Sequence, residues 1–406
     1  MLYKQTVLLT GITFLGLTGY ILRLEQLYFM TAVVALLAAG SYALCVLSVR
    51  GVELRRGPAR KLHEGEWCDL SLILTNTSRL PKVFLGVSDT LPQWLEPVGE
   101  SSFIVPVLLP GRSAELAYRV RGMKRGAFVI GPVSISATDM MGAFRVERRL
   151  AAPQEVIVYP ATVRVRPEPL GGVLRFGGAE TEQVSASGSG LEFYGIRDYR
   201  PGDPLRRIHW PSTARLGHFA VVEFEETFGA DVVLALDLRR ATEYGSGKDT
   251  TLETAIRAAA SLAAFAVENG AEAVVAARDS KRSYLVSARR EQELPALLEA
   301  LARMEADGHA PPAEVMASVE GAASGAVAVV LTAAPDEGLI GAVESWVRRQ
   351  AQVVVVLLDG ASWTGEGAAD IYKAARRLQA AGARVEILRR GDELQRLLGR
   401  TVSDEA

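Results

Sequence analysis

The stretch DVVLALD at residues 231–237 opens the part of the chain that decides its fold. It is a continuous apolar run that ends in an aspartate. Similar runs return further along the chain, at 271–279 (AEAVVAARD), 326–333 (AVAVVLTA), 352–359 (QVVVVLLD) and 383–390 (ARVEILRR). Runs that are apolar at every position are typical of parallel strands that are buried on both faces of a sheet.

Helical patterns separate these apolar runs. Apolar residues recur with helical spacing in four segments, 249–268, 289–306, 337–350 and 368–382. A short helix is expected near Leu394. Since crossover helices cover both faces of a parallel sheet, we predict a doubly wound α/β domain over residues 231–400. Ligands of such sheets bind beyond the carboxyl ends of the strands, near Asp237, Thr332, Asp336 and Asp359.

Two apolar segments lie at the beginning of the sequence. Residues 6–22 and 27–49 carry no charged side chain, and only RLEQ separates them. About 20 helical residues cross the hydrocarbon core of a bilayer. We therefore predict two transmembrane helices within residues 1–50. A cleaved signal peptide is the rival interpretation, but no A-x-A-like site follows the first segment, and the second begins almost at once.

The charges that flank these segments predict their orientation. Lys4 precedes the first segment, and a basic cluster follows the second, made of Arg50, Arg55, Arg56, Arg60 and Lys61. Because basic residues favour the cytoplasmic ends of spans, we expect a two-pass protein whose soluble domains are cytoplasmic. Cys45 and Cys68 have no C-x-x-C neighbour, and we expect them to be buried apolar residues in a reducing compartment.

Residues 51–165 differ from both neighbouring regions. Short alternating runs such as LSLILTN, FLGVSD and ELAYRVR are separated by Pro, Gly, Asn and Ser. This pattern predicts an antiparallel β-sandwich of immunoglobulin-like size, with Trp67 and Phe128 as core aromatics. A docking module and a spacer remain equally open as its role, since such folds serve many functions.

The overall charge restricts the class of partner. The 406 residues are enough for two or three domains, and 45 Lys plus Arg against 47 Asp plus Glu give a net charge of -2. This balance disfavours nucleic acid as the principal partner.

The densest polar cluster is residues 190–215, GLEFYGIRDYRPGDPLRRIHWPSTAR, within a linker and signature region over 166–230. The pattern E-F, R-x-Y-x-x-G-D, R-x-I-H-W and A-R closely resembles the signature of the bacterial family known as domain of unknown function 58. It is carried by Glu192, Phe193, Arg197, Tyr199, Gly202, Asp203, Arg207, Ile208, His209, Trp210, Ala214 and Arg215. RG at 125–126, GP at 131–132 and TDMMGAF at 138–144 resemble the family's sandwich region, although D-P-F-G-L-F is more usual there.

The resemblance implies a fold, partners and a location. The family combines a sandwich with a von Willebrand factor A-like domain, and its genes lie beside those of MoxR-type AAA+ ATPases and transglutaminase-like membrane proteins. The resemblance thus implies a bacterial cell-membrane protein that works with such an ATPase, and with a transglutaminase-like protein as a further partner. The implied role is assembly or maturation of protein complexes, or a response to envelope stress.

The metal site of an A-domain is normally built on D-x-S-x-S at the end of the first strand. Asp237 is present here, but the serine positions hold Arg239 and Ala241, so a cation would lose two oxygen ligands and meet a guanidinium. We therefore expect no cofactor, with Asp237, Thr332 and Asp336 as the remaining candidates for a degenerate Mg²⁺ site. We expect instead that Asp237 pairs with Arg239 or caps the following helix.

The polar cluster also permits a catalytic interpretation. Glu192, Asp198, Asp203 and His209 offer a general acid and base, and the arginines offer an anion site. However, PSTAR at 211–215 is not a G-x-S-x-G elbow, so no nucleophile is positioned. We therefore expect a non-catalytic structural or partner-binding network of Glu192, Arg197, Tyr199, Asp203, Arg207, His209, Trp210 and Arg215. A hydrolase or transferase that acts on an anionic substrate is the alternative.

Neither glycine-rich stretch predicts a nucleotide site. GSG at 188–190 lacks the lysine of a phosphate-binding loop, and GSGKDT at 245–250 is too short to form one. We expect the second stretch to be the loop before a helix, and we expect ATP hydrolysis to come from a partner.

Overall fold

The computed structural model describes residues 2–59, 61–165, 193–198, 210–224, 231–322, 325–365, 371–392 and 394. The chain forms two compact units, Met1–Pro160 and Ala161–Ala406. We call the first the antiparallel unit and the second the α/β unit, and describe each by itself.

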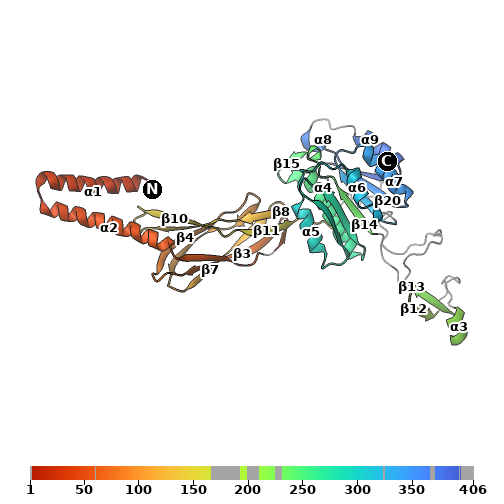
Figure 1. The fold of residues 1–406 in the computed structure, drawn as a ribbon, viewed down its shortest axis with the longest axis horizontal. Coiled ribbons are helices and arrows are strands. Elements are labelled where there is room, and N and C mark those ends of the chain that lie inside the picture. Colours follow the sequence, from red (N-terminus) through yellow and green to blue (C-terminus); the bar gives the residue numbers. More distant parts are fainter. Residues whose placement is uncertain are drawn as a thin grey trace. The chain divides into compact units, whose positions relative to one another are not determined.

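The antiparallel unit begins with a helical hairpin, α1 (Leu2–Leu22) and α2 (Glu25–Val49) (Figure 1). Both helices are long and apolar enough to cross a membrane, and they contain the two predicted spans. The hydroxyls of Thr13 and Thr31 donate to the carbonyl oxygens four residues earlier, at 2.8 and 2.7 Å. These two hydroxyls are therefore satisfied within their own helices, as a hydrocarbon environment would require.

Three sheets follow the hairpin, and most of their pairings are antiparallel. The first, in spatial order, is β1 (Val52–Arg56), β3 (Trp67–Asn76), β7 (Ser113–Gly122) and β5 (Leu95–Val98). The second is β10 (Arg145–Leu150), β9 (Val133–Thr138), β4 (Lys82–Asp89) and β6 (Ser102–Leu108). The third is β2 (Leu62–His63), β11 (Gln154–Tyr159) and β8 (Gly126–Ile130), in which β2 and β11 run parallel. The prediction of antiparallel strands in this region is confirmed.

The sheets share one apolar core. Alternate residues of β3, among them Leu72 and Leu74, are fully buried, and so are Leu85 and Ile135 of the second sheet. Strand side chains point to opposite faces in turn, so each sheet contributes one apolar face to this core. Cys45 and Cys68 belong to the same cluster as buried free thiols, as expected.

The prediction that Trp67 is a core aromatic is wrong. Its side chain is 55% exposed and lies 4.3 Å from the Arg119 guanidinium, in a cation–π contact. The next residue, Cys68, is one of the inward-pointing residues of β3. Because side chains alternate along a strand, Trp67 points to solvent. Phe128 is half-buried and packs against the core, as its prediction requires.

A buried ion pair connects the first two sheets. Arg56 of β1 donates to both carboxylate oxygens of Asp89 of β4, at 2.6 and 2.7 Å, and Tyr118 of β7 donates to the same carboxylate. The Arg56 and Asp89 side chains are 6% and 0% exposed. Arg56 also donates to the Ala152 carbonyl. Burial, together with hydrogen bonding to Asp89, raises the pKa of Tyr118. The charges are therefore desolvated but fully hydrogen-bonded, the condition under which a buried pair is tolerated.

We predict that Asp89→Ala destabilises the antiparallel unit strongly, because it leaves the Arg56 guanidinium buried and unpaired. Removing one partner of such a pair costs about 3–5 kcal/mol, or a melting temperature lower by roughly 10 °C. The measurement is thermal unfolding of the detergent-solubilised chain. The control is Asp69→Ala, which breaks the exposed Arg119–Asp69 pair and should cost about 1 kcal/mol at most. Equal shifts for both variants would contradict the prediction.

The α/β unit is built on a six-stranded sheet. Its spatial order is β18 (Ser283–Ala288), β17 (Ala273–Arg278), β14 (Val232–Leu236), β19 (Val327–Thr332), β20 (Gln352–Leu358) and β21 (Arg384–Leu388). Neighbouring strands are parallel except for β18, which pairs antiparallel with β17 at one edge. The five apolar runs of the sequence form the five parallel strands.

Helices cover both faces of this sheet (Figure 1). Val233 and Ala235 of β14 lie in one apolar cluster with α6 (Pro312–Ser318), α7 (Glu337–Arg348) and α9 (Ile371–Ala380). The alternate residues of β14 point to the other face, where α4 (Thr251–Glu268) contacts β14 and β17, and α5 (Leu294–Arg303) contacts α4. The helices predicted over 249–268, 289–306, 337–350 and 368–382 correspond to α4, α5, α7 and α9.

Strand β18 and helix α6 are among the elements of the α/β unit that were not predicted. Strand β18 is an edge strand whose residues alternate between exposed and half-buried, so it lacks the continuous apolar run of the central strands. Helix α6 has only seven residues. The GSGKDT loop forms a short hairpin, β15 (Gly245–Ser246) and β16 (Asp249–Thr250), and Thr250 caps α4 by accepting from the Glu253 amide. Most of the short helix predicted near Leu394 lies outside the described residues.

Candidate functional site

The order of the strands creates a switch point beside β14. The chain runs from β14 outward to β17 and β18, and then crosses back to β19 on the other side of β14. The loops that leave β14 and β19 therefore diverge at their carboxyl ends, which is where open α/β sheets bind ligands. Asp237 follows β14, Thr332 ends β19, and Asp336 caps helix α7 by accepting from the Leu339 amide at 2.8 Å.

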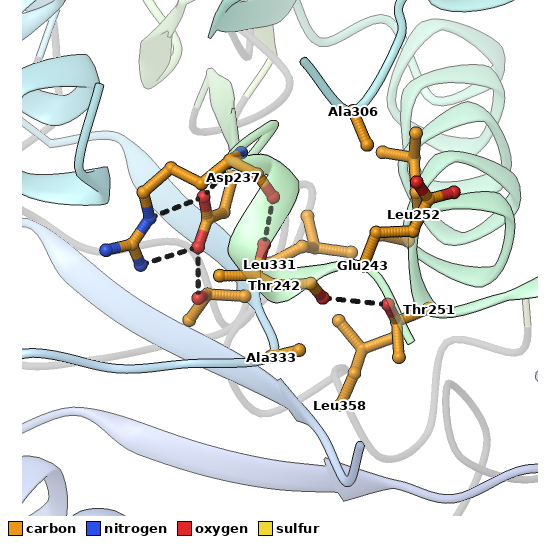
Figure 2. A pocket seen from close by; sticks show the side chains of 12 residues that line it. Asp237, Thr242, Glu243, Thr251, Leu252, Ala306, Leu331, Ala333 and Leu358 are labelled. Carbon is orange, nitrogen blue, oxygen red and sulfur yellow. Dashed lines mark hydrogen bonds and ion pairs between the residues drawn. The ribbon is translucent and has the colours of Figure 1, made fainter. Parts of the chain in front are cut away.

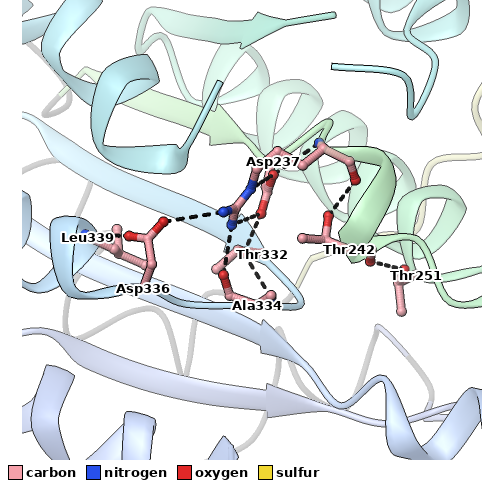
Figure 3. A network of polar contacts seen from close by, with 8 residues as sticks. Asp237, Thr242, Thr251, Thr332, Ala334, Asp336 and Leu339 are labelled. Atoms are coloured by element: carbon pink, nitrogen blue, oxygen red, sulfur yellow. Dashed lines mark hydrogen bonds and ion pairs between the residues drawn. The ribbon is translucent and has the colours of Figure 1, made fainter. Parts of the chain in front are cut away.

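Arg239 joins the residues at this edge of the sheet. Its partners Asp237, Ala334 and Asp336 are labelled in Figure 3. Its guanidinium donates to both carboxylate oxygens of Asp237, at 2.9 and 2.8 Å, and to the Ala334 carbonyl at 2.7 Å. It also reaches the carboxylate of Asp336 at 3.2 Å. Thr332 donates to Asp237 Oδ2 at 2.6 Å. The loops after β14 and β19 are thus joined through one cation.

The electrostatics of the site favour a charged arginine. The Asp237 side chain is 1% exposed, that of Arg239 20% and that of Asp336 35%. Hydrogen bonding to Asp237 raises the pKa of Arg239, and the charge of Asp336 adds to the effect. The guanidinium therefore compensates the buried carboxylate that would be a metal ligand in a D-x-S-x-S site. The expected pairing of Asp237 with Arg239 is confirmed, and three of the four predicted edge residues meet in one network.

The cavity beneath this network is small (Figure 2). Asp237, Thr242, Thr251 and Leu331 are among the residues that line it, and its volume is about 10 Å³. That is the room of about one water molecule. The floor is itself hydrogen-bonded, because Thr242 donates to the Arg239 carbonyl at 2.8 Å and Thr251 donates to the Thr242 carbonyl at 2.9 Å. This cavity leaves no space for a substrate.

Gly308 anchors the loop that carries Arg239, and sequence reasoning missed it. The Gly308 amide donates to the Leu238 carbonyl at 2.9 Å, and Gly308 forms a parallel bridge with Arg239. A Cβ atom here would lie 2.4 Å from the Arg278 carbonyl oxygen, so only glycine fits. A single glycine in a connection, here between α5 and α6, is a weak signal in one sequence, which is why the contact was not foreseen.

The fourth predicted edge residue lies in a different set of contacts. Asp359 follows β20 and forms an ion pair with Arg389 at 3.6 Å. Nearby, Asp249 accepts from the Trp363 indole at 3.1 Å and from Arg390 at 2.7 Å. These contacts connect the β15–β16 hairpin to helix α8 (Ala361–Thr364) and to the residues after β21. They stabilise the surface next to the Arg239 network without joining it.

The signature cluster is only partly described. Glu192, Tyr199, Asp203, Arg207 and His209 lie outside the described residues. Arg197 lies on β12 (Phe193–Asp198), which pairs antiparallel with β13 (Ala220–Phe224). Trp210 begins α3 (Trp210–Leu216), is 63% exposed and contacts the Phe219 ring edge-on at 6.3 Å; Arg215, in the last turn, is also exposed. A structural or partner-binding network of these residues stays a prediction.

The fold and the site define a class of protein: an open, mainly parallel α/β sheet whose switch point is occupied by an arginine–aspartate network. Residues 195–388 match the family described as Protein of unknown function DUF58, the family that the signature resembles. The Bacillus subtilis (strain 168) protein described as Uncharacterized protein YeaD is 20% identical over 254 residues. The match spans 62% of this chain and 62% of the length of that relative.

Two solved structures share a limited likeness with the chain. The conserved hypothetical protein BatB from Bacteroides thetaiotaomicron is 14% identical with a TM-score of 0.31, and the match covers 41% of this chain and 94% of that one. An aerotolerance-related membrane protein from Bacteroides fragilis NCTC 9343 is 14% identical with a TM-score of 0.31, covering 42% and 95%. At these TM-scores the likeness carries no inference about function.

We predict that the residue at position 239 decides whether this edge of the sheet binds a metal cation. The double variant Arg239→Ser, Ala241→Ser creates D-x-S-x-S and supplies two hydroxyl oxygens, so it should gain a Mg²⁺-dependent rise in melting temperature. The wild-type chain should show neither that rise nor heat in a calorimetric titration. Arg239→Ala is the control: it should lose about 3 kcal/mol of stability, because Asp237 stays buried, and gain no Mg²⁺ response. Stoichiometric Mg²⁺ binding by the wild type would refute the prediction.

Proposed function

We propose that the protein is a membrane-anchored, non-catalytic adaptor or assembly factor that works with a MoxR-type AAA+ ATPase. In this proposal the antiparallel unit is an immunoglobulin-like sandwich and the α/β unit is a von Willebrand factor A-like binding module. Both units face the cytoplasm of a bacterial cell. The protein and the ATPase act together in the maturation of protein complexes or in envelope stress.

The observation that carries the proposal is the guanidinium of Arg239 between Asp237 and Asp336. It supplies a built-in cation where an A-domain would need a metal ion, so the edge is organised before any partner arrives. Asp336 remains 35% exposed and can accept a hydrogen bond from a partner. The cavity beneath the network has room for about one water, so that cavity does not favour a substrate.

The helical hairpin supports the membrane part of the proposal. Arg50 and Arg55 are exposed after α2 and fit a cytoplasmic end. Two members of the predicted basic cluster do not serve as free flanking charges. Arg56 is committed to the buried pair with Asp89, and Lys61 lies over the Tyr159 ring, near the end of the antiparallel unit. The orientation therefore depends on fewer cations than the sequence indicates.

We predict that an AAA+ ATPase co-purifies with the detergent-solubilised chain from its native membrane, and that the sheet edge is needed for this. Asn retains the helix-capping ability of Asp, so Asp336→Asn removes charge without removing the cap of α7. If the contact is worth about 1.4 kcal/mol, recovery of the ATPase by mass spectrometry falls roughly tenfold. Asp203→Ala with Arg207→Ala tests the signature region in the same way.

The matched control is Arg348→Gln, which alters the exposed Glu344–Arg348 pair at the other end of α7. It should leave recovery unchanged. Absence of any AAA+ ATPase with the wild-type chain would sink the adaptor proposal. Turnover of an anionic substrate that disappears in His209→Ala, with folding intact, would favour the hydrolase or transferase alternative.

A further inference from the structure

One face of the last two turns of helix α2 packs into the protein core, while Leu44 and Leu47 on the other face are exposed. Cys45 and Val49 are 4% exposed and lie in the apolar cluster of the three sheets. Lys82 of β4 donates to the Leu47 carbonyl at 2.5 Å, and Arg148 of β10 donates to the Val49 carbonyl at 3.3 Å. These cations satisfy carbonyls that a helix end leaves free, and they complement its dipole. This end of α2 is therefore fixed to the sheets, and lipid can surround the helix on all sides only before it.

The contacts of the β9–β10 turn mark where that part ends. Phe144 meets the ring of Tyr42 on α2 edge-on, with centroids 5.7 Å apart. In the same turn the Met141 carbonyl accepts from Lys4 of α1 at 3.2 Å. The turn thus touches both helices, and Lys4 and Tyr42 lie at one level of the hairpin.

The remaining helix lengths match a bilayer. Glu25 to Tyr42 on α2 is about 18 residues, or roughly 27 Å, and Lys4 to Leu22 on α1 is about 19 residues, or roughly 28 Å. The hydrocarbon core is about 30 Å thick. Tyrosine and lysine are also the residues that anchor spans at the membrane surface. The level of Lys4 and Tyr42 therefore corresponds to the membrane surface on the side of the antiparallel unit.

The turn presents two methionines at this level. Met140 is 97% exposed and Met141 is 79% exposed. The turn that carries them is held by Asp139, whose carboxylate accepts from the Phe144 amide at 2.7 Å and whose carbonyl accepts from the Gly142 amide at 3.0 Å. Gly142 has φ +66°, which favours glycine. A rigid turn that points adjacent apolar side chains outward marks an interaction surface.

We propose that the β9–β10 turn inserts Met140 and Met141 into the boundary between headgroups and acyl chains, beside the helical hairpin. This inference depends on the proposed membrane anchoring. We assign lipid as the partner of the turn because the turn is continuous with the lipid-facing helices. The exposed Arg145 on β10 can also meet anionic headgroups. Together with the fixed end of α2, the turn gives the antiparallel unit a second attachment, which holds it in one orientation on the bilayer.

The test places an environment-sensitive fluorophore at Met140→Cys in the full chain, reconstituted into vesicles of phosphatidylcholine and phosphatidylglycerol. The native thiols are buried, and the wild-type chain labelled in parallel is the blank. The matched control is Glu100→Cys, an exposed position in the β5–β6 connection. That connection leads into the end of β6 where Ser102 pairs with Ser88, away from the Lys82–Leu108 end that adjoins α2.

At position 140 we expect blue-shifted emission, quenching by spin-labelled lipid and protection from aqueous iodide, whereas position 100 should show the reverse. Adding Met141→Asp should reduce lipid quenching of the label at 140. Iodide access at 140 equal to that at 100, in protein that resists carbonate extraction, would overturn the inference and leave the anchoring intact. Protein released by carbonate would overturn the anchoring as well. Protection from both quenchers would mean that protein covers the turn, which also overturns the inference.

Discussion

The contact between Arg239 and Asp237 organises the carboxyl edge of the sheet in the α/β unit. A carboxylate that is 1% exposed cannot remain charged alone in the interior, and the guanidinium supplies the opposite charge and two hydrogen bonds. Because the same guanidinium reaches Ala334 and Asp336, it also fixes the loop after β19 and the start of α7. The geometry at the switch point thus depends on one side chain.

The antiparallel unit uses the same physical solution in a different place. Arg56, Asp89 and Tyr118 form a buried charged network between two sheets, far along the chain from one another. In both units a planar guanidinium meets a carboxylate through two bonds, a geometry that lysine does not reproduce. We expect these networks to add specificity to the apolar packing, because a displaced strand would leave a charge buried and unpaired.

The attachment of α2 gives the membrane hairpin a structural connection to the soluble part of the antiparallel unit. The helix ends inside the apolar core, with its last carbonyls bound by Lys82 and Arg148. Burial lowers the pKa of Lys82, so its charge is held at some energetic expense, which the helix carbonyls offset. In the proposed membrane anchoring, a hairpin connected in this way holds the antiparallel unit close to the bilayer.

The sequence by itself determined the local features of this protein. Continuous apolar runs predicted the five parallel strands, alternation predicted the antiparallel strands, and Asp237 and Arg239, two positions apart, predicted their own pairing. Only the tertiary structure decided which face each alternation presents, and so placed Trp67 in solvent and Arg56 in the core. It also decided the strand order, which brings Thr332 to Asp237 and Asp336 to Arg239 across 95 and 97 residues of chain. The physical reason is that the spacing of apolar residues along the chain determines helices and strands locally, whereas contacts between distant residues depend on how whole sheets pack.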